Sequence, residues 1–324
     1  MNGTSTPLVQ AFHGFGTEVC VRLWPRPGRE QEAAGALQRA VALLRRAERR
    51  LSRFDPRSDL SRINRRAGEP VRVGRLTRAV VAEALAAAHA TGGLFDPTVL
   101  RAVQAAGYDR DFALLAKGGA VTADAPDVPR ARFRAVEIDW QAGTVRVPVG
   151  AELDLGGIAK GWLADAVVRR LRRYGAALAD LGGDIAVAGR PPGEEAWQIE
   201  VADPWDGPRP LVVLHLRPGT AGVATSGVLR RRWSTPDGPR HHIIDPRTGR
   251  PACTDLVQVT VAAPRAAAAE AAATAALLLG RDKAATVLAL SGCLAGVLVD
   301  VHGTVTSVGF SNRERWATWH PTEA

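Results

Sequence analysis

The chain has 324 residues, of which 46% are apolar and 23% charged, a balance typical of a folded globular protein and not of a disordered one. No apolar stretch is long enough to span a bilayer, and three widely separated cysteines without a Cys-x-x-Cys pair argue against a disulfide framework or a structural zinc site. Lysine and arginine outnumber aspartate and glutamate by 42 to 33, a net charge of +9, so anionic partners have to be considered.

The periodicity of apolar residues predicts the elements in chain order. In the first half it predicts a strand at 17–24, helices at 30–51, 77–89 and from about 97, an irregular stretch at 107–130, and a hairpin of 135–140 with 144–147. In the second half it predicts a helix at 157–174, strands at 177–180, 184–188, 197–201, 211–216 and 256–262, a hairpin of 228–233 with 241–244 closed at 236–238, a helix at 266–279, another helix, and a last hairpin near 300–303. Because the strands cluster instead of alternating strictly with helices, the pattern favours the α+β class.

Arginine supplies most of the positive charge, and its clusters fall on stretches predicted to be helical. Solvated helix faces explain these clusters more simply than nucleic-acid binding, because the chain has only two tyrosines and no recognisable nucleic-acid motif. Residues 1–12 lack a charged region followed by an apolar core, so the sequence predicts no signal peptide and a cytoplasmic location.

Residues 154–161 join the end of a predicted strand to the start of a helix through Gly156 and Gly157. Two glycines let the backbone approach a ligand closely, and the N–H groups at a helix N-terminus attract phosphate. Lys160 lies in the first turn, where the helix dipole disfavours a cation unless an anion compensates, and it is one of only three lysines. The spacing is neither a Rossmann fingerprint nor a P-loop. The pattern indicates an anion site, with a plain turn and a surface lysine as the alternative.

The helix predicted at 266–279 carries only two polar side chains, Glu270 and Thr274, which project from one face because they are four residues apart. A helix that is apolar all round should be buried, and a buried carboxylate is costly unless it is paired or bound to a metal. A carboxylate with a hydroxyl offers hard oxygen ligands, which suit Mg²⁺ better than zinc. The alternative is that Glu270 pairs with an arginine while Thr274 bonds its own backbone.

A third constellation combines residues 224–227 with the segment 241–249, in which two histidines precede an Asp-Pro turn. A histidine before such a turn could serve as a general base or a phosphate ligand. Taken alone, adjacent histidines on a strand more often have no catalytic or ligand-binding role.

Eight segments follow one another in a recognisable order, at residues 15–17, 52–58 with 63–64, 93–99, 154–161, 181–184, 224–227, 242–249 and 269–274. Taken together, these segments resemble the FAD:protein FMN transferase family, also called the ApbE family. The resemblance implies an ApbE-like α+β fold, with mixed and antiparallel sheets flanked by helices in two interlocked subdomains. It also implies one domain over residues 1–310 and a polar C-terminal tail at 311–324.

The same resemblance implies that the protein binds FAD and Mg²⁺ and transfers the FMN half to a Thr or Ser hydroxyl of an acceptor protein, releasing AMP. By matching positions, His242 would lie at the reacting phosphate, and Gly157 (through its carbonyl), Glu270 and Thr274 would hold the metal. The FAD pocket would be lined by Phe15, Phe54, Leu94, Phe95, Asp96, Asp154, Lys160, Thr225, Ser226 and Ile244.

Three of these positions depart from the family's usual residues, which are Met in place of Phe15, Tyr in place of Phe54 and Asp in place of Glu270. Phe54 can still stack on a flat ring but lacks the hydroxyl, and Glu270 keeps the charge on an arm one methylene longer. Two alternatives stay open. One is an FAD-binding or FAD-hydrolysing relative without a protein acceptor, and the other, from a different class, is a basic module that binds anions or nucleic acid.

Overall fold

An eight-stranded sheet forms the centre of the computed structural model, which describes residues 6–115, 131–236, 238–290, 292–293, 295–309 and 317–321. Every neighbouring pair of strands in this sheet is antiparallel. The strands lie in the order β1 (Leu8–Gly14), β2 (Thr17–Pro25), β6 (Gly175–Leu181), β7 (Ile185–Gly189), β10 (Gly219–Gly227), β15 (Leu256–Ala263), β16 (Ala295–Asp300) and β17 (Val305–Val308).

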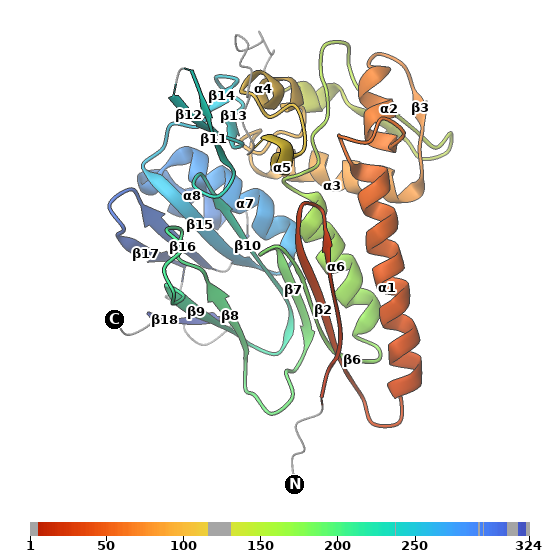
Figure 1. Ribbon diagram of the computed structural model, residues 1–324, viewed down its shortest axis with the longest axis vertical. Helices are drawn as coiled ribbons and strands as arrows, with labels where there is room; N and C mark the ends of the chain where they lie inside the picture. The colour runs from red at the N-terminus through yellow and green to blue at the C-terminus, as the bar shows by residue number, and fades with distance from the viewer. Residues whose placement is uncertain are drawn as a thin grey trace.

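Helices cover one face of this sheet (Figure 1). The helix α7 (Ala266–Leu279) packs on β10 and β15, and α6 (Ala159–Leu171) packs on β6, β7 and α7. The long helix α1 (Glu30–Leu51) lies outside α6, and α8 (Arg281–Leu290) packs on α7. Because α7 is buried between α6 and the sheet, it has no solvent face, which explains its almost uniformly apolar sequence.

A smaller sheet covers the opposite face, with strands β8 (Trp197–Val201), β9 (Val212–Leu216) and β18 (Ala317–Pro321) in the order β18-β9-β8. Alternate residues of β15 point to opposite faces, so Val259 and Val261 join the cluster that contains α7, whereas Ala262 packs with Trp197 and Ile199. The strand β18 lies within the stretch predicted as a polar tail, and it pairs with β9.

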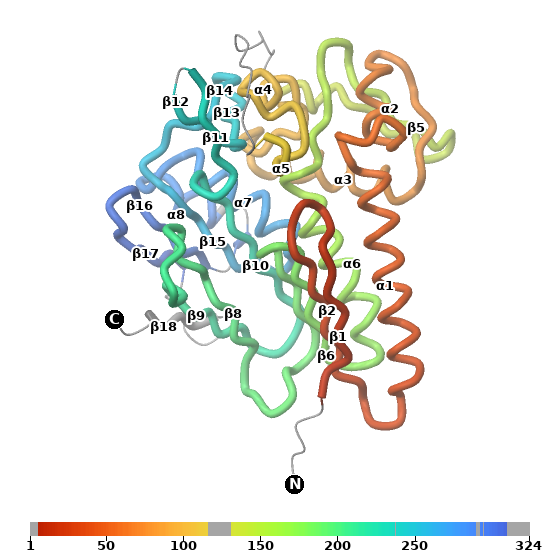
Figure 2. The backbone as a smooth tube through the Cα atoms, viewed as in Figure 1, coloured from red at the N-terminus to blue at the C-terminus, as the bar shows by residue number. Residues whose placement is uncertain are grey.

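The remaining elements form a cap over one end of the sheet (Figure 2). Part of the cap follows α1 and carries α2, α3 and a three-stranded sheet, and part follows β10 and carries two short hairpins. The elements are α2 (Asp59–Arg65), β3 (Val71–Arg72), α3 (Arg75–Ala90), α4 (Leu100–Ala105), α5 (Phe112–Leu115), the 3₁₀ helix η1 (Arg132–Ala135), β4 (Glu137–Asp139), β5 (Thr144–Arg146), β11 (Arg232–Thr235), β12 (Gly238–His241), β13 (Ile244–Asp245) and β14 (Arg250–Pro251).

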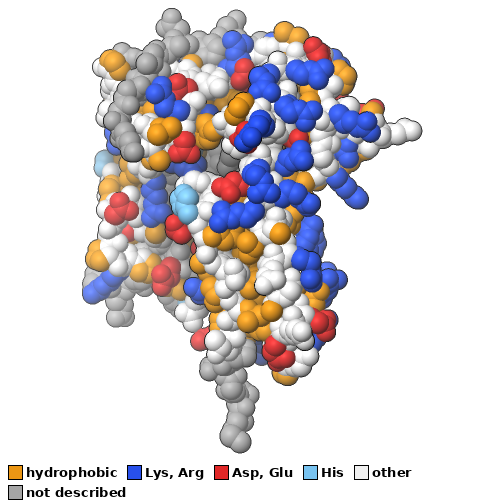
Figure 3. All heavy atoms as spheres, turned by 45° about the vertical axis from the view of Figure 1, so that its right-hand side comes forward, with side chains coloured by type: hydrophobic (Ala, Val, Ile, Leu, Met, Phe, Trp, Pro, Cys, Tyr) orange, Lys and Arg blue, Asp and Glu red, His pale blue; other side chains and the backbone are white. Residues whose placement is uncertain are grey.

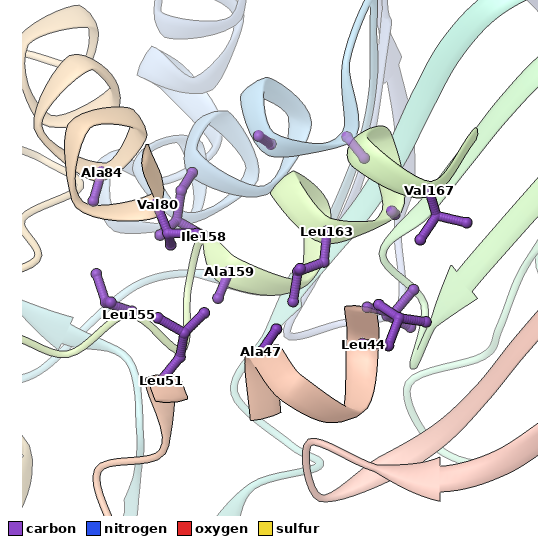
Figure 4. Close-up of a cluster of buried hydrophobic side chains, with 14 of the residues drawn as sticks. Leu44, Ala47, Leu51, Val80, Ala84, Leu155, Ile158, Ala159, Leu163 and Val167 are labelled. Carbon is purple, nitrogen blue, oxygen red and sulfur yellow. The ribbon is translucent and has the colours of Figure 1, made fainter. Parts of the chain in front are cut away.

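The cap is joined to the helical layer by a shared apolar core (Figure 4). The labelled side chains in this view come from α1, α3, the loop before α6 and α6 itself, and their burial removes a continuous apolar surface from water. They include Leu44, Ala47, Leu51, Val80, Ala84, Leu155, Ile158, Ala159, Leu163 and Val167.

The α+β class with helix-flanked sheets is confirmed, and the differences from prediction are local. The helix predicted from about 97 begins at Leu100, because the Asp96 carboxylate accepts the backbone N–H and the hydroxyl of Thr98 and holds the chain in a turn. The stretch 107–130 was predicted to be irregular, but it contains α5; its residues 116–130 lie outside the described part of the chain, as does Asp237 of the predicted hairpin closure.

The net positive charge is unevenly distributed over the surface. On the face drawn in Figure 3, Lys and Arg side chains gather over the upper half, and hydrophobic side chains occupy more of the lower half. Within the described residues, no helix combines the length and the apolar character needed to cross a membrane. The cytoplasmic location stays a prediction.

Candidate active site

The ammonium group of Lys160 lies between two carboxylates at the N-terminal end of α6. It is in ion-pair contact with Asp184, in the turn between β6 and β7, and its Nζ lies 3.3 Å from Oε1 of Glu270 on α7. All three side chains are largely withdrawn from water, at 16%, 3% and 6% exposure for Lys160, Asp184 and Glu270. One cation facing two carboxylates leaves surplus negative charge, which suits a further cation.

The second oxygen of Glu270 fixes the distance between α6 and α7. Its Oε2 accepts the backbone N–H of Gly161 at 2.9 Å, one of the N–H groups at a helix start that lack a partner within the helix. A Cβ at position 161 would lie only 2.7 Å from the backbone of Ala266. The close approach of the two helices therefore requires glycine here.

Burial raises the pKa of the Glu270 carboxyl, while the charge of Lys160 and the N–H of Gly161 oppose that rise. In the structure the Glu270 carboxylate is paired with Lys160, and not with an arginine as the alternative interpretation expected; metal binding by this carboxylate stays a prediction. One turn further along α7, the Thr274 hydroxyl donates to the Glu270 carbonyl at 3.2 Å and lies 2.9 Å from the Ser226 hydroxyl at the end of β10. Lys160, Ser226, Glu270 and Thr274 are thus brought together.

Asp154 and Gly157 lie in the turn that leads into α6. The side chain of Asn64 holds this turn from α2, because it donates to the carbonyl of Leu153 at 2.9 Å and accepts its N–H at 2.8 Å. The Asp154 carboxylate accepts the N–H of Gly156 at 2.8 Å, and its other oxygen lies 3.8 Å from Nε of Arg53. A Cβ at Gly157 would lie 3.2 Å from the Phe95 ring, so this glycine lets the ring approach the turn.

The side chain of Asp96 turns back into its own loop. Its Oδ1 accepts both the N–H and the hydroxyl of Thr98, and burial raises its pKa. Leu94, two residues earlier, packs at the edge of the cluster that contains α7. Phe95 and Asp96 are buried, so these two residues shape the loop beside Gly157.

His242 follows β12 and is partly buried. Withdrawal from water lowers the pKa of its imidazole to about 3, and the positive charges of Arg231, His241 and Lys160 act in the same direction. Its Nδ1 has no hydrogen-bond partner among the described residues. The imidazole is therefore neutral at pH 7, as a proton acceptor must be, and it lies within the electrostatic influence of Lys160.

Thr225 does not reach this cluster. Successive residues of a strand point to opposite faces, so Ser226 faces α7 while the Thr225 hydroxyl lies 2.8 Å from that of Thr260 on β15. Ser226 and Thr225 were predicted together, and the structure brings only Ser226 to Thr274.

Three other predicted FAD-pocket residues make contacts outside this cluster. Phe54 follows α1, is 39% exposed, and has the guanidinium of Arg53 4.5 Å from its ring centre. Ile244 packs in the apolar cluster that contains Tyr108, whose ring centre lies 6.1 Å from that of Phe54. Phe15 occupies the turn between β1 and β2 with φ of 56°, and its N–H donates to Glu48 on α1 at 2.6 Å.

The start of α7 is capped by a side chain from α6. Both carboxylate oxygens of Asp165 accept backbone N–H groups, from Ala266 at 2.9 Å and from Ala267 at 3.1 Å. Burial raises the pKa of this carboxyl to about 6, although the two N–H donors oppose the rise. Asp165 therefore positions the helix that carries Glu270 and Thr274.

The donor set around Glu270 is compatible with Mg²⁺. No group of three or more His, Cys, Asp or Glu side chains in the described part of the chain is arranged to hold a metal ion, which argues against a cage made only of such side chains. Mg²⁺ usually takes one or two carboxylates and completes its six positions with water and substrate phosphates. Glu270 with the Thr274 hydroxyl, and the surplus negative charge beside Lys160, fit that arrangement.

Comparison with known proteins assigns the family. The model of the ApbE family matches residues 15–298. The chain belongs to the ApbE family. A FAD:protein FMN transferase of Treponema pallidum is 36% identical over 296 residues, which cover 85% of this chain and 79% of that protein. One from Vibrio cholerae is 30% identical over 247 residues, covering 74% and 72%.

Solved structures of the family share the fold. The ApbE protein of Thermotoga maritima superposes with a TM-score of 0.80 at 27% identity, covering 94% of this chain and 97% of that one. The flavinyl transferase ApbE of Pseudomonas stutzeri superposes with a TM-score of 0.73 at 24% identity, covering 93% and 95%, a likeness that concerns the fold alone.

In this ApbE-family chain, the residue-level predictions omitted Asp184, Asn64 and Asp165. Asp184 is the last residue of the segment 181–184. Gly182 and Gly183 before it, with φ of 71° and 91°, indicate a tight turn, which could have pointed to the residue that follows. Asn64 was likewise part of a recognised segment. No local signal distinguished Asp165, because its role as a cap depends on contact with a helix far along the chain.

Proposed function

We propose that this protein transfers the FMN moiety of FAD to a Thr or Ser hydroxyl of an acceptor flavoprotein, in a Mg²⁺-dependent reaction that releases AMP. The observation that carries the proposal is the cluster at the start of α6, where Lys160, Asp184 and Glu270 meet beside the Thr274 hydroxyl. Relatives named FAD:protein FMN transferase that cover most of the chain support the same reaction.

The proposed metal ligands are Glu270, Thr274 and the carbonyl of Gly157. A divalent cation there would neutralise the pyrophosphate and stabilise the departing AMP. Lys160 already neutralises part of the charge of Asp184 and Glu270, and its ammonium would be available to contact a phosphate oxygen of the substrate. Asp154 and the glycines after it form the turn against which the substrate would lie, with Phe95, Phe54 and Ile244 as its apolar surroundings.

His242 is the proposed general base. As the acceptor oxygen forms its bond to the phosphorus on the riboflavin side, the hydroxyl proton passes to the imidazole, and the P–O bond to the AMP phosphate breaks. The imidazole is free to accept the proton because its pKa is about 3 in the unliganded protein. A bound pyrophosphate would add negative charge beside the ring and raise that pKa, which makes the ring a stronger base when substrate is present.

The experiment combines purified protein, FAD, Mg²⁺ and a candidate acceptor protein, with a Thr/Ser→Ala acceptor as the control. Covalent flavin is followed by in-gel fluorescence and AMP by chromatography. Transfer predicts fluorescence and AMP that both require the acceptor hydroxyl. AMP released equally without acceptor would identify an FAD hydrolase instead, and no AMP under either condition would contradict flavin chemistry at this site.

A further inference from the structure

A groove of about 400 Å³ lies between the middle of α1 and the C-terminal end of α6. Its lining contains four arginines, one tyrosine and four apolar side chains, and no carboxylate. The polar residues are Arg39 and Arg46 on α1, and Arg170, Arg173 and Tyr174 at the end of α6. Arg170 is ten residues beyond Lys160, about 15 Å along the helix, so this groove is separate from the candidate active site.

Every polar side chain in the lining can donate a hydrogen bond, and the one acceptor among them, the Tyr174 hydroxyl, is already used. The Tyr174 hydroxyl accepts from Nη2 of Arg173 at 2.8 Å and from Nη2 of Arg39 at 3.5 Å. Its lone pairs are thereby used, and among the described residues its own proton has no acceptor. Tyr174 lines the groove and is only 6% exposed. A donor-only lining requires a ligand rich in acceptor oxygens.

The arginines of the groove differ from their neighbours on the same helix. Arg45 pairs with Glu48 at 3.5 Å and Arg50 with Asp59 at 3.0 Å, whereas no carboxylate of the described residues forms an ion pair with Arg39 or Arg46.

At the end of α6, Arg170 donates only to the carbonyl of Ala166, at 2.7 Å. Burial lowers its pKa, and the charges of Arg169 and Arg46 lower it further. The charge of Arg173 helps to lower the pKa of the Glu32 carboxyl, but that carboxylate is hydrogen-bonded to Arg29 at 2.6 Å. The positive charge in the groove is therefore uncompensated.

We propose that this groove binds a small phosphate-rich anion of the pyrophosphate class. Guanidinium groups match phosphate oxygens in paired hydrogen bonds, and the lining holds two arginines from α1, one from α6 and one from the turn after α6. The volume is that of a small-molecule site, and the largely buried Tyr174 can be reached only by a compact group. These features favour a small anion over the acidic surface of a partner protein. The proposal does not depend on the proposed transferase activity.

The test is calorimetric titration of the full-length protein with inorganic pyrophosphate, at fixed ionic strength and with EDTA to remove divalent cations. The paired variant Arg46→Gln/Arg170→Gln removes one guanidinium from each helix. Its matched control, Arg49→Gln/Arg169→Gln, removes the same charge from neighbouring positions outside the lining. Tyr174→Phe removes only the hydroxyl and keeps the ring on which Arg29 and Arg173 lie.

We expect the paired groove variant to weaken pyrophosphate binding at least about tenfold, since it loses two charge-assisted contacts. Tyr174→Phe should weaken it by a few-fold, and the control should bind like the parent. Equal weakening by the groove variant and its control would show a diffuse charge effect and overturn the proposal. Absence of binding to the parent, or binding of poly-glutamate in place of pyrophosphate, would overturn it as well.

Discussion

The two ends of α6 carry opposite electrostatic surroundings. At the N-terminal end, one ammonium faces two carboxylates, and every charged group in the cluster is buried and paired. At the C-terminal end, four guanidinium groups surround a groove that has no carboxylate in its lining. The dipole of the helix alone would favour anions at the first end and cations at the second.

This difference shows that local charge placement, and not the dipole, decides what each end can bind. Asp184 and Glu270 come from elements far along the chain and place two carboxylates beside Lys160 at the start of α6. The positive charge of arginines at the end of α6 is favoured by the negative end of the helix dipole. The two arginines from α1 add more positive charge than this dipole can compensate. The two ends of α6 thus differ in charge, with carboxylates gathered at its start and arginines at its end.

The largest effect is expected from His242→Ala, which removes the proposed base and leaves the charges around Lys160, at the start of α6, in place. Transfer should fall by roughly 10²- to 10⁴-fold, because no other neutral proton acceptor with this placement replaces it. The measurement is the rate of covalent flavin formation, with circular dichroism to verify the fold. Transfer at the parental rate by a folded variant would exclude an essential role for His242.

Glu270→Gln removes one of the two carboxylates at the start of α6, so the charge there becomes more positive, as it is at the other end of the helix. The apparent affinity for Mg²⁺ should drop by roughly 10- to 100-fold, an effect of the size seen when the surroundings of a metal are altered. Glu270→Asp, which keeps the carboxylate, should bind Mg²⁺ as well as the parent or better. Calorimetric titration with Mg²⁺ measures both, and a Gln variant that titrates like the parent would remove Glu270 from the metal site.

Gly161→Ala tests the contact that brings Glu270 to α6. The added methyl would lie 2.7 Å from the backbone of Ala266, so the two helices must separate at a cost of about 1–3 kcal/mol. Gly35→Ala is the matched control within α1, since its methyl meets only the flexible end of Arg39 at 3.3 Å. The control should gain about 0.5–1 kcal/mol because alanine favours the helix. Urea unfolding should give these opposite signs.

Asp165→Ala removes the cap of α7 and should destabilise the protein by roughly 1–2 kcal/mol at pH 7.5. The loss should grow on acidification. With a folded pKa of about 6, above the ordinary value near 4, the parent binds a proton in this window only when folded, and so gains stability as pH falls from about 6 to 4. Urea unfolding at pH 7.5 and pH 5 measures the difference in free energy of unfolding between parent and variant. A gap that narrows at pH 5 would contradict the raised pKa.

The sequence predicted best those elements whose pattern is local and repeated. The bounds of α7 were predicted as observed, because a run of alanine and leucine ends at a glycine. In contrast, β10 is a strand of small residues without clear alternation, and it is extended because β7 and β15 hydrogen-bond to it on both sides. The short helix α2 depends on the Ser58 side chain, which accepts the N–H of Ser61.

The same limit applies to the candidate site. Lys160 and Glu270 were recognised separately, one as unusual in an arginine-rich chain and the other as a carboxylate on an apolar helix. Their meeting, and the part of Asp184 in it, depends on how α6, α7 and the β6–β7 turn pack, which no local pattern encodes. Thr225 shows the converse, because adjacency to Ser226 in the sequence places it on the opposite face of the sheet.

The burial of β15 has a consequence for how the site moves. All eight residues of this strand are buried, and it is hydrogen-bonded to β10 and β16 along its length, so its amide protons should exchange with solvent only on global unfolding. Glu270 and Thr274 lie on the helix packed against it. His242 instead follows β12, which pairs only with β11 among the described strands, and this two-stranded ribbon should open more readily than the central sheet although Trp233 anchors it to Ala106. Hydrogen exchange should therefore be slow in the strand packed behind Glu270 and Thr274, the proposed metal ligands, and faster in the ribbon that precedes His242, the proposed base.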